Sequence, residues 1–389
     1  MGGRGTLRRA AHGFVGAVTV LLYLAFVVPV SRLRGRAKRR RGDLPAILWG
    51  PVPIVSIGLM NRAERALGYK SDSLVYEIYR IGARTQFTYV LDRMYRIPAL
   101  GRLVPYGAFL WAGFRYDIFS FFFDGGLLAP TPWWRVELSL LRLAGKRIVV
   151  LPYGGDARLA SRVRERGGWH DYIDVPPGAE DRDESEIRAH LRAFEQHANV
   201  VFGCADLYED LPRVDRMFHY PFDTDSWSPS PEENDGVVTV VHAPNHRHYK
   251  GTRFLEEAIE RLRDEGVPVE LVLVEGLPNE EARQVYERAD VVADQFLNGA
   301  YAMFSLEGMA LGKPVVCYLR DLFHEAHREW AECPIVSASP DTLEVELRRL
   351  ALDPELRRST GEAGPAYVER HHSLAVVGRE LDAVYRQIW

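Results

Sequence analysis

Residues 291–318 form one unit of a parallel sheet: a strand, a loop, a helix and a second strand. The apolar segment 291–294 predicts a buried strand, and the loop after it carries Asn298 and Gly299. A helix follows, and a Gly–Lys–Pro turn at 312–314 leads into the next apolar strand. Parallel strands must be covered by helices on both faces, so this unit constrains the chain to the α/β class.

Glu307 lies in the first turns of the helix in this unit, among residues that are otherwise apolar. A carboxylate at this place suits a ligand that offers hydroxyl groups, such as the ribose of a nucleotide. Backbone N–H groups at the start of the same helix suit its phosphates. The unit therefore predicts a nucleotide site.

The chain has 389 residues, more than a single hydrophobic core usually supports, which favours two domains. Strands and helices alternate in two blocks, residues 43–225 and residues 226–370, each typical of a Rossmann-like domain. A segment rich in Pro, Asp and Ser at 218–236 is typical of an interdomain linker. We expect two Rossmann-like domains facing each other across a cleft, and a last helix at 371–389 that could cross back to the first domain. Strands are predicted at 46–49, 74–78, 116–123, 146–152, 200–205, 236–242, 269–276, 291–294 and 314–319, and other late helices at 341–352 and 354–371.

The N-terminal arm, residues 1–42, carries ten Lys or Arg and no acidic residue. The rest of the chain keeps 39 of the 49 basic residues against all 53 acidic residues, a net charge of −14. An acidic body argues against nucleic-acid binding.

Residues 13–30 of this arm are uncharged, and as a helix they would extend roughly 27 Å, enough for a bilayer core. The stronger basic flank follows this stretch, which places the body on the cytoplasmic side of a cell membrane. A helix dipped into the inner leaflet gives the same side, and a disordered or cleaved leader is the alternative. The apolar, irregular segment 97–111 could be core or a second membrane-facing patch.

A metal centre is not expected from the sequence. The three cysteines, Cys204, Cys317 and Cys333, have no metal-binding spacing. The acidic pair Asp223 and Asp225 has the spacing of a metal motif, but it lies in the Pro-rich linker and not at the end of a buried strand. We therefore expect no metal and no other cofactor.

The loop at 243–251 follows a predicted strand and opens a helix. It brings Asn245, His246, Arg247 and Lys250 together. Cations and amides just before a helix N-terminus suit a diphosphate. The alternative is a solvated basic turn.

Segments 242–259, 272–282 and 305–316 together resemble the C-terminal half of the family 4 glycosyltransferases, retaining enzymes of glycosyl transferases group 1 with the GT-B fold. The N-terminal half is similar too, at 116–123 and 145–158. The resemblance covers residues 45–385 and is strongest over 240–318.

The resemblance implies a role for each matching residue of the second domain. Lys250 and Arg247 would neutralise the donor diphosphate, and Glu307 would bind the ribose hydroxyls, so these three are the expected catalytic residues. The other expected donor-binding residues are Asn245, His246, Val274, Glu275, Gly299, Met303, Phe304 and Ser305. On the acceptor side we expect Gly50, Asp156 and Arg158, with a structural Asx turn and a surface arginine as the alternative for the last two.

The chain departs from the family pattern at three positions. Gly299 stands where the family has the first glutamate of a pair, and Tyr153 replaces a histidine of the first domain. Asn245 occupies the usual arginine position, five residues before the lysine. A related subgroup carries the pattern seen here at Asp294, Gln295, Gly299 and Tyr301.

The resemblance implies a membrane-attached glycosyltransferase of polysaccharide biosynthesis at the cell envelope. It would move a sugar from a nucleotide diphosphate sugar to a glycan or lipid-linked acceptor, with retention of configuration. One alternative is a catalytically inactive glycosyltransferase-like scaffold in polysaccharide assembly. Another is an inverting enzyme of the same fold that acts on a lipid-linked sugar.

Overall fold

The computed structural model describes residues 2–79, 84–176, 178–180, 182–230, 236–320 and 328–389. Contacts divide the chain into two compact units. Unit 1 comprises Met1–Arg158, Asp183–Phe218 and Val377–Trp389, and unit 2 comprises Leu159–Arg182 and His219–Val376. The chain thus passes from one unit to the other four times.

Unit 1 is built, within the described residues, on a seven-stranded parallel sheet in the order β3-β2-β1-β4-β5-β6-β7. Strands β1 and β4 are buried along their whole length, as expected for central parallel strands. The strands are β1 (Ala46–Trp49), β2 (Lys70–Val75), β3 (Tyr89–Val90), β4 (Ile118–Phe122), β5 (Arg147–Leu151), β6 (Val200–Gly203) and β7 (Arg216–Met217).

The core of unit 1 includes the C-terminal helix α18 (Leu374–Ile388), which packs Val377, Leu381 and Tyr385 against strands β1 and β4. The N-terminus of α9 (Glu184–His197) is capped by Asp183, whose side chain accepts the backbone N–H of Ser185 at 2.8 Å. The other helices of this unit are α3 (Ser56–Ala66), η2 (Arg84–Gln86), α4 (Asp92–Tyr95), α5 (Pro98–Gly101), α6 (Val104–Arg115), α7 (Trp134–Leu143), α9 (Glu184–His197) and η3 (Ala205–Glu209).

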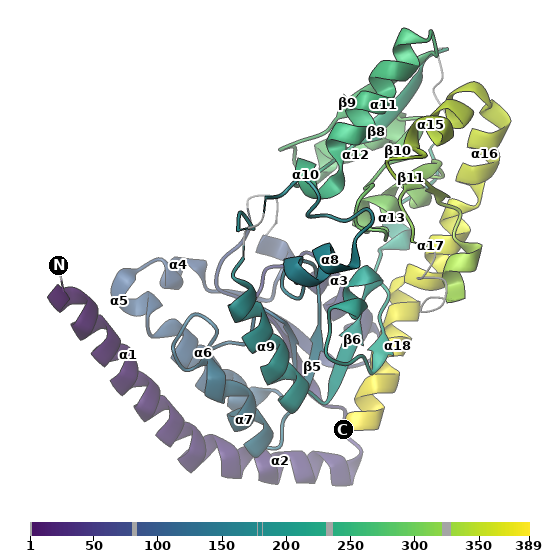
Figure 1. The fold of residues 1–389 in the computed structure, drawn as a ribbon. Coiled ribbons are helices and arrows are strands. Elements are labelled where there is room, and N and C mark those ends of the chain that lie inside the picture. The colour runs from purple at the N-terminus through teal and green to yellow at the C-terminus, as the bar shows by residue number, and fades with distance from the viewer. Residues whose placement is uncertain (1, 80–83, 177, 181, 231–235, 321–327) are drawn as a thin grey trace. The chain divides into compact units, whose positions relative to one another are not determined.

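The N-terminal arm is one continuous helix made of α1 (Gly2–Leu22), the π-helical turn η1 (Tyr23–Val27) and α2 (Val28–Arg41), drawn in purple in Figure 1. It ends where Gly42 takes a left-handed conformation with φ of 74°. Among the described residues, His12–Arg41 is the one helix that is long and apolar enough to cross a membrane by length and composition.

Unit 2 holds, among the described residues, a five-stranded parallel sheet in the order β12-β11-β10-β8-β9. The strands are β8 (Val238–His242), β9 (Val269–Leu273), β10 (Val291–Ala293), β11 (Val315–Cys317) and β12 (Val336–Ser337). Its helices are α8 (Ala160–Arg166), η4 (Thr224–Ser226), α10 (Arg247–Lys250), α11 (Thr252–Asp264), α12 (Asn279–Arg288), α13 (Met303–Ala310), η5 (Arg328–Glu332), α15 (Leu343–Leu352), α16 (Pro354–Glu362) and α17 (Gly364–His372).

The predicted fold class, two parallel-sheet α/β domains with an N-terminal apolar helix, is confirmed. Some predicted elements are wrong in detail. The segment 97–111 is not irregular but mostly helical, and α6 buries Tyr106, Phe109 and Ala112 as core, whereas Ile97 and Leu103 are exposed. The single helix predicted over 354–371 is two helices, α16 and α17, because Pro365 has no N–H for the helical hydrogen bond to the preceding turn.

Candidate functional site

The candidate site lies at the carboxyl edge of the sheet in unit 2, where the loops after β8 and β10 meet. Strand β8 pairs with β9 on one side and with β10 on the other, so the order of the strands reverses between β8 and β10. Open α/β sheets bind ligands just outside the carboxyl ends of the strands at such a reversal.

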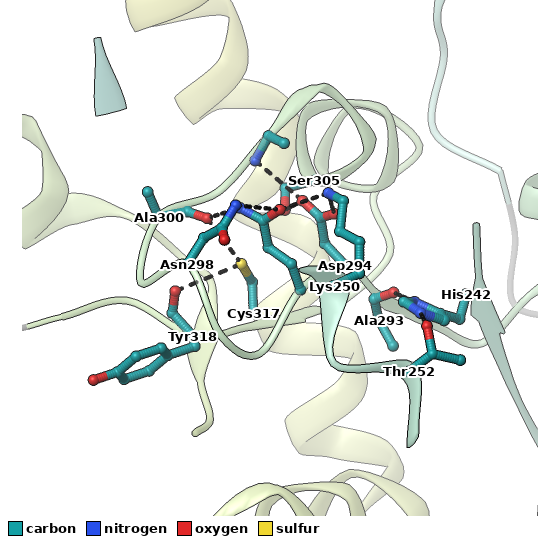
Figure 2. A network of polar contacts seen from close by, with 12 residues as sticks. His242, Lys250, Thr252, Ala293, Asp294, Asn298, Ala300, Ser305, Cys317 and Tyr318 are labelled. Carbon is teal, nitrogen blue, oxygen red and sulfur yellow. Dashed lines mark hydrogen bonds and ion pairs between the residues drawn. The ribbon is translucent and has the colours of Figure 1, made fainter. Parts of the chain in front are cut away.

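An ion pair joins the two loops. The Nζ of Lys250, at the end of α10, lies 2.8 Å from Oδ1 of Asp294, the first residue after β10 (Figure 2). Nζ also donates to Oε1 of Gln295 at 2.6 Å. The Lys250 side chain is 19% exposed and that of Asp294 only 1%, so the lysine is partly open to solvent whereas the carboxylate is buried.

Asp294 also fixes the N-terminus of helix α13. Its Oδ2 accepts the hydroxyl of Ser305 at 2.7 Å and the backbone N–H of Ala302 at 3.1 Å. Burial alone would raise the pKa of the Asp294 carboxyl, but the Lys250 ammonium and these two donors hold it below its ordinary value. Asp294 is therefore an ionised group that positions both the lysine and the helix start.

Glu307 follows in the next turn of α13 and is half-buried. Burial, and then the charge of Asp294, raise the pKa of Glu307 to about 7. The carboxyl group is thus poised between its two protonation states at neutral pH. Its surroundings include Arg283, whose charge acts in the opposite direction on its pKa.

His242, the last residue of β8, is buried near the ion pair. Its Nδ1 lies 2.7 Å from the carbonyl of Ala293, and its Nε2 lies 2.8 Å from Oγ1 of Thr252 (Figure 2). Burial lowers the pKa of His242 to about 4. The ring is therefore neutral, with Nδ1–H donating to the carbonyl and Nε2 accepting from the hydroxyl, and it links β8, β10 and α11.

Arg247 lies apart from this buried network, in a cluster of its own. Its Nε and Nη2 contact the two carboxylate oxygens of Glu275 at 2.9 and 2.5 Å, and its Nη1 lies 3.1 Å from Glu256. All three side chains are exposed. The expected second cation, Arg247, and the expected donor-binding residue Glu275 are therefore partners of each other.

Gly299 has a φ of +73°, and a Cβ built on it would lie 2.4 Å from Cγ of Arg320. Where the glycosyltransferases that the sequence resembles have a carboxylate, this chain packs the stem of an arginine. Sequence reasoning missed Arg320. The sequence did offer a signal for this contact. Gly299 lies in the loop after one buried strand, and Arg320 lies just after the neighbouring strand.

The remaining predicted donor residues lie around these clusters. Asn245 and His246 are exposed, and the His246 ring lies 5.9 Å from that of Tyr249. Val274 is buried, and its N–H donates to the carbonyl of His242 at 2.9 Å. In α13, Phe304 packs on Tyr286 with ring centroids 4.8 Å apart, and Met303 begins the helix.

The predicted acceptor-side residues belong to unit 1. Asp156 is buried and accepts the N–H groups of Phe123, Tyr153 and Gly154 at 2.9–3.0 Å. These donors all precede Asp156 in the sequence, whereas an Asx turn uses the N–H two residues later, so these contacts are not the Asx turn given above as the alternative. Arg158 is buried and not on the surface, and its guanidinium pairs with Asp206 and Asp210.

Gly50 and Tyr153 complete this side. A Cβ on Gly50 would lie 2.1 Å from the carbonyl oxygen of Leu74, so no other residue fits there. The hydroxyl of Tyr153, which replaces the family's histidine, donates to Asp124 at 2.5 Å. The roles of Gly50, Asp156 and Arg158 in acceptor binding stay predictions.

Among the described residues, no group of three or more His, Cys, Asp or Glu side chains could hold a metal ion. Asp223, from the acidic pair considered above, accepts a hydrogen bond from Ser226 at 2.7 Å beside the short helix η4.

Comparisons with known proteins agree with this fold. Residues 247–383 match the model of a family described as glycosyl transferase-like. No curated protein matches the sequence of the chain. Among solved structures, sucrose-phosphate synthase from Thermosynechococcus elongatus is similar with a TM-score of 0.59 at 14% identity, over 89% of this chain and 99% of that one.

A second similar structure is HepE from Anabaena in complex with UDP-glucose, with a TM-score of 0.56 at 12% identity, over 88% of this chain and 100% of that one. A Listeria monocytogenes protein described as a UDP-N-acetylglucosamine 2-epimerase has a TM-score of 0.50 at 12% identity, over 88% and 95% of the two chains. At such identities the similarity establishes the fold alone. The chain has the two-domain GT-B fold, and residues 247–383 resemble a glycosyl transferase-like family.

Proposed function

We propose that the chain is a glycosyltransferase that binds a nucleotide diphosphate sugar in unit 2. The observation that carries the proposal is the Lys250 ammonium at the strand-order reversal, held by Asp294 at the N-terminus of α13, with Glu307 in the next turn. A cation, a helix N-terminus and a carboxyl group in this order complement a diphosphate followed by a ribose. The family match over 247–383 supports the transferase assignment, and the UDP-glucose complex of HepE shows that a protein of this fold binds such a donor.

In this proposal Lys250 and Arg247 stabilise the negative charge that develops on the diphosphate as the sugar leaves. The N–H groups at Met303, Phe304 and Ser305 add hydrogen bonds at the helix start. The protein would then act chiefly through positioning and electrostatic stabilisation. Because two side chains supply the positive charge, we propose that the donor needs no divalent metal.

We further propose that the acceptor is a glycan or a lipid-linked sugar, that the configuration of the sugar is retained, and that the body lies at the cytoplasmic face of a membrane. The family resemblance supports retention, and the basic, apolar N-terminal helix supports the location. NMR of the product distinguishes a retaining enzyme from an inverting one by the anomeric configuration. Retained configuration is expected, and inverted product would contradict it.

The test of the donor site is calorimetry with UDP and GDP, followed by transfer assays with a panel of nucleotide sugars. Lys250→Ala is expected to weaken nucleotide binding at least tenfold, and Glu307→Ala to weaken it without removing it. Lys70→Ala, an exposed lysine on β2 of unit 1, is the matched control and should bind like the wild type. If both site variants bind nucleotide and turn over as the wild type does, the donor assignment is wrong.

A second candidate function is an inactive scaffold, and two observations favour it. Both candidate cations are already paired with carboxylates, and Gly299 carries no side chain where the family has a glutamate. A scaffold with a decayed site should bind neither UDP nor GDP. Nucleotide binding in the calorimeter would therefore exclude this alternative.

A further inference from the structure

The N-terminal helix is packed along one side against the rest of unit 1. The buried positions recur every three or four residues: Gly16, Thr19, Tyr23, Val27, Ser31 and Gly35. This spacing is the signature of a helix with one buried face.

Specific contacts hold this face from one end to the other. Near the start, Nε1 of Trp133 donates to the carbonyl of His12 at 3.1 Å. In the middle, the ring of Tyr23 stacks on Phe109 of α6 with centroids 4.4 Å apart. Near the end, Nζ of Lys38 lies 2.6 Å from Asp117. Residues 12 and 38 are about 39 Å apart along a helix. The contacts between the arm and the rest of unit 1 therefore extend over a length greater than the thickness of a bilayer core.

The π-helical turn η1 keeps the buried face in line. In an α-helix, a step of four residues rotates the side chain by about 40° beyond a full turn, so the spacing from Thr19 to Gly35 would drift off unit 1. The wider turn at Tyr23–Val27 absorbs part of this rotation. Gly113 of α6 completes the fit, since a Cβ there would lie 2.7 Å from Val27 and 2.8 Å from Tyr23.

The other side of the helix is apolar and exposed. Phe14 is 72% exposed and Leu33 is 67% exposed. The other large apolar side chains that are exposed on this helix are Val18, Leu21, Leu22, Leu24, Phe26 and Val30. Basic residues follow directly, and Arg36 and Arg40 point into solvent. No acidic residue occurs in residues 1–42 to offset them.

We infer that this helix does not cross the bilayer but lies in the plane of an anionic lipid leaflet, with its exposed apolar side among the acyl chains and its arginines at the headgroups. A helix that crossed would have to release its contacts with unit 1 or draw unit 1 into the hydrocarbon. The exposed apolar side of the helix continues directly into a cluster of basic residues. We therefore take an anionic lipid surface to be what binds this side of the helix. This inference rests on the proposed membrane location. Its tests measure lipid binding and topology, not turnover. A negative result would therefore contradict the membrane arrangement without bearing on the donor site.

The first experiment is co-sedimentation of the full chain with vesicles of phosphatidylcholine, with and without phosphatidylglycerol. Binding is expected to be strong only to the anionic vesicles. Phe14→Glu/Leu33→Glu should abolish binding, whereas Val345→Glu/Leu352→Glu, a pair of similarly exposed apolar residues on α15, should leave it unchanged. Arg36→Gln and Arg40→Gln should each weaken binding about fivefold. Equal loss in the α15 control pair, or self-association of the chain without lipid binding, would overturn the inference.

The second experiment distinguishes a helix that lies in the plane of the membrane from one that crosses it. Gly13→Cys and Ala37→Cys, each with Cys333→Ser, place one accessible thiol near either end of the helix, since Cys204 and Cys317 are buried and a Cβ on Gly13 meets no atom within 4 Å. A membrane-impermeant maleimide should label both positions in inside-out membrane vesicles and neither in right-side-out vesicles. Labelling of the two positions from opposite sides shows a crossing helix and contradicts the inference.

Discussion

The ammonium of Lys250 lies 2.8 Å from the carboxylate of Asp294, whose side chain is almost completely buried. The pair holds the cation in place before any ligand arrives. It also means that a diphosphate meets a lysine whose charge is already partly neutralised. The ligand must share the ammonium with Asp294, because a buried carboxylate without its counter-charge is costly.

Lys250→Met should lower the free energy of unfolding by about 3 kcal/mol, since it leaves the Asp294 carboxylate buried without its cation. The double variant Lys250→Met/Asp294→Asn should recover most of this loss but still bind UDP at least tenfold more weakly than the wild type. Urea unfolding of both variants and of Asp294→Asn completes the double-mutant cycle. Additive effects would show that the two residues do not stabilise each other.

Glu307 should make donor binding depend on pH. Its pKa of about 7 means that the carboxyl group is protonated below neutral pH and ionised above it. Only the ionised form accepts hydrogen bonds from both ribose hydroxyls, so the affinity for UDP should rise as the pH increases through 7. Glu307→Gln should lose this dependence. Calorimetry between pH 6 and 8 measures both, and parallel curves would contradict the role of Glu307.

His242 should make the fold sensitive to acid. Its pKa is lowered from 6.5 to about 4, so the folded state binds this proton less readily than the unfolded state. The stability that depends on the neutral ring is complete above pH 6.5 and is lost as the pH falls towards 4, by about 3 kcal/mol at most. The measurement is the unfolding free energy of the wild type and of His242→Gln over this range. The difference between them should shrink as the pH falls.

Gly299→Ala should destabilise the fold by about 1–2 kcal/mol, because an alanine is strained at φ of +73° and its Cβ overlaps Arg320. Gly276→Ala is the matched control, with φ of +69° and no atom within 4 Å of the added Cβ. It should show the conformational cost alone. Thermal unfolding of the two variants gives the steric part as their difference, and equal destabilisation would show that Arg320 gives way freely.

Removal of divalent metals should leave donor binding intact. Lys250 and Arg247 are proposed to supply the charge that a metal would otherwise supply. Calorimetry with UDP in excess EDTA checks this, with magnesium added back as the control. Loss of binding in EDTA that magnesium restores would contradict the metal-free donor site.

The sequence alone predicted the elements that form the site in unit 2. Lys250 and Glu307 each follow a strongly apolar strand, and parallel strands place such residues at one edge of the sheet. Strands β1 and β10 were also predicted within a residue, because a run of four apolar residues forms β1, and a run of three apolar residues between two aspartates forms β10. The two-residue strands β3, β7 and β12 are too short to show any period.

The partners of the charged side chains could not be predicted. Arg247 pairs with Glu275 across 28 residues of sequence, and Arg320 packs on Gly299 from the next strand. Such contacts depend on the order of strands in the sheet and on side-chain packing. Neither can be predicted from the pattern of neighbouring residues in the sequence. For the same reason, the burial of Arg158 against Asp206 and Asp210 was not foreseen.

The four passages of the chain between the two units have a consequence for synthesis on the ribosome. The core of unit 1 contains Val377, Leu381 and Tyr385 of α18, which follow all of unit 2 in the sequence. Unit 1 therefore cannot complete its core until the whole of unit 2 has been made, although its first strand emerges early. Until then its sheet exposes apolar surface, and the nascent chain should depend on chaperones for longer than a protein whose N-terminal domain folds first.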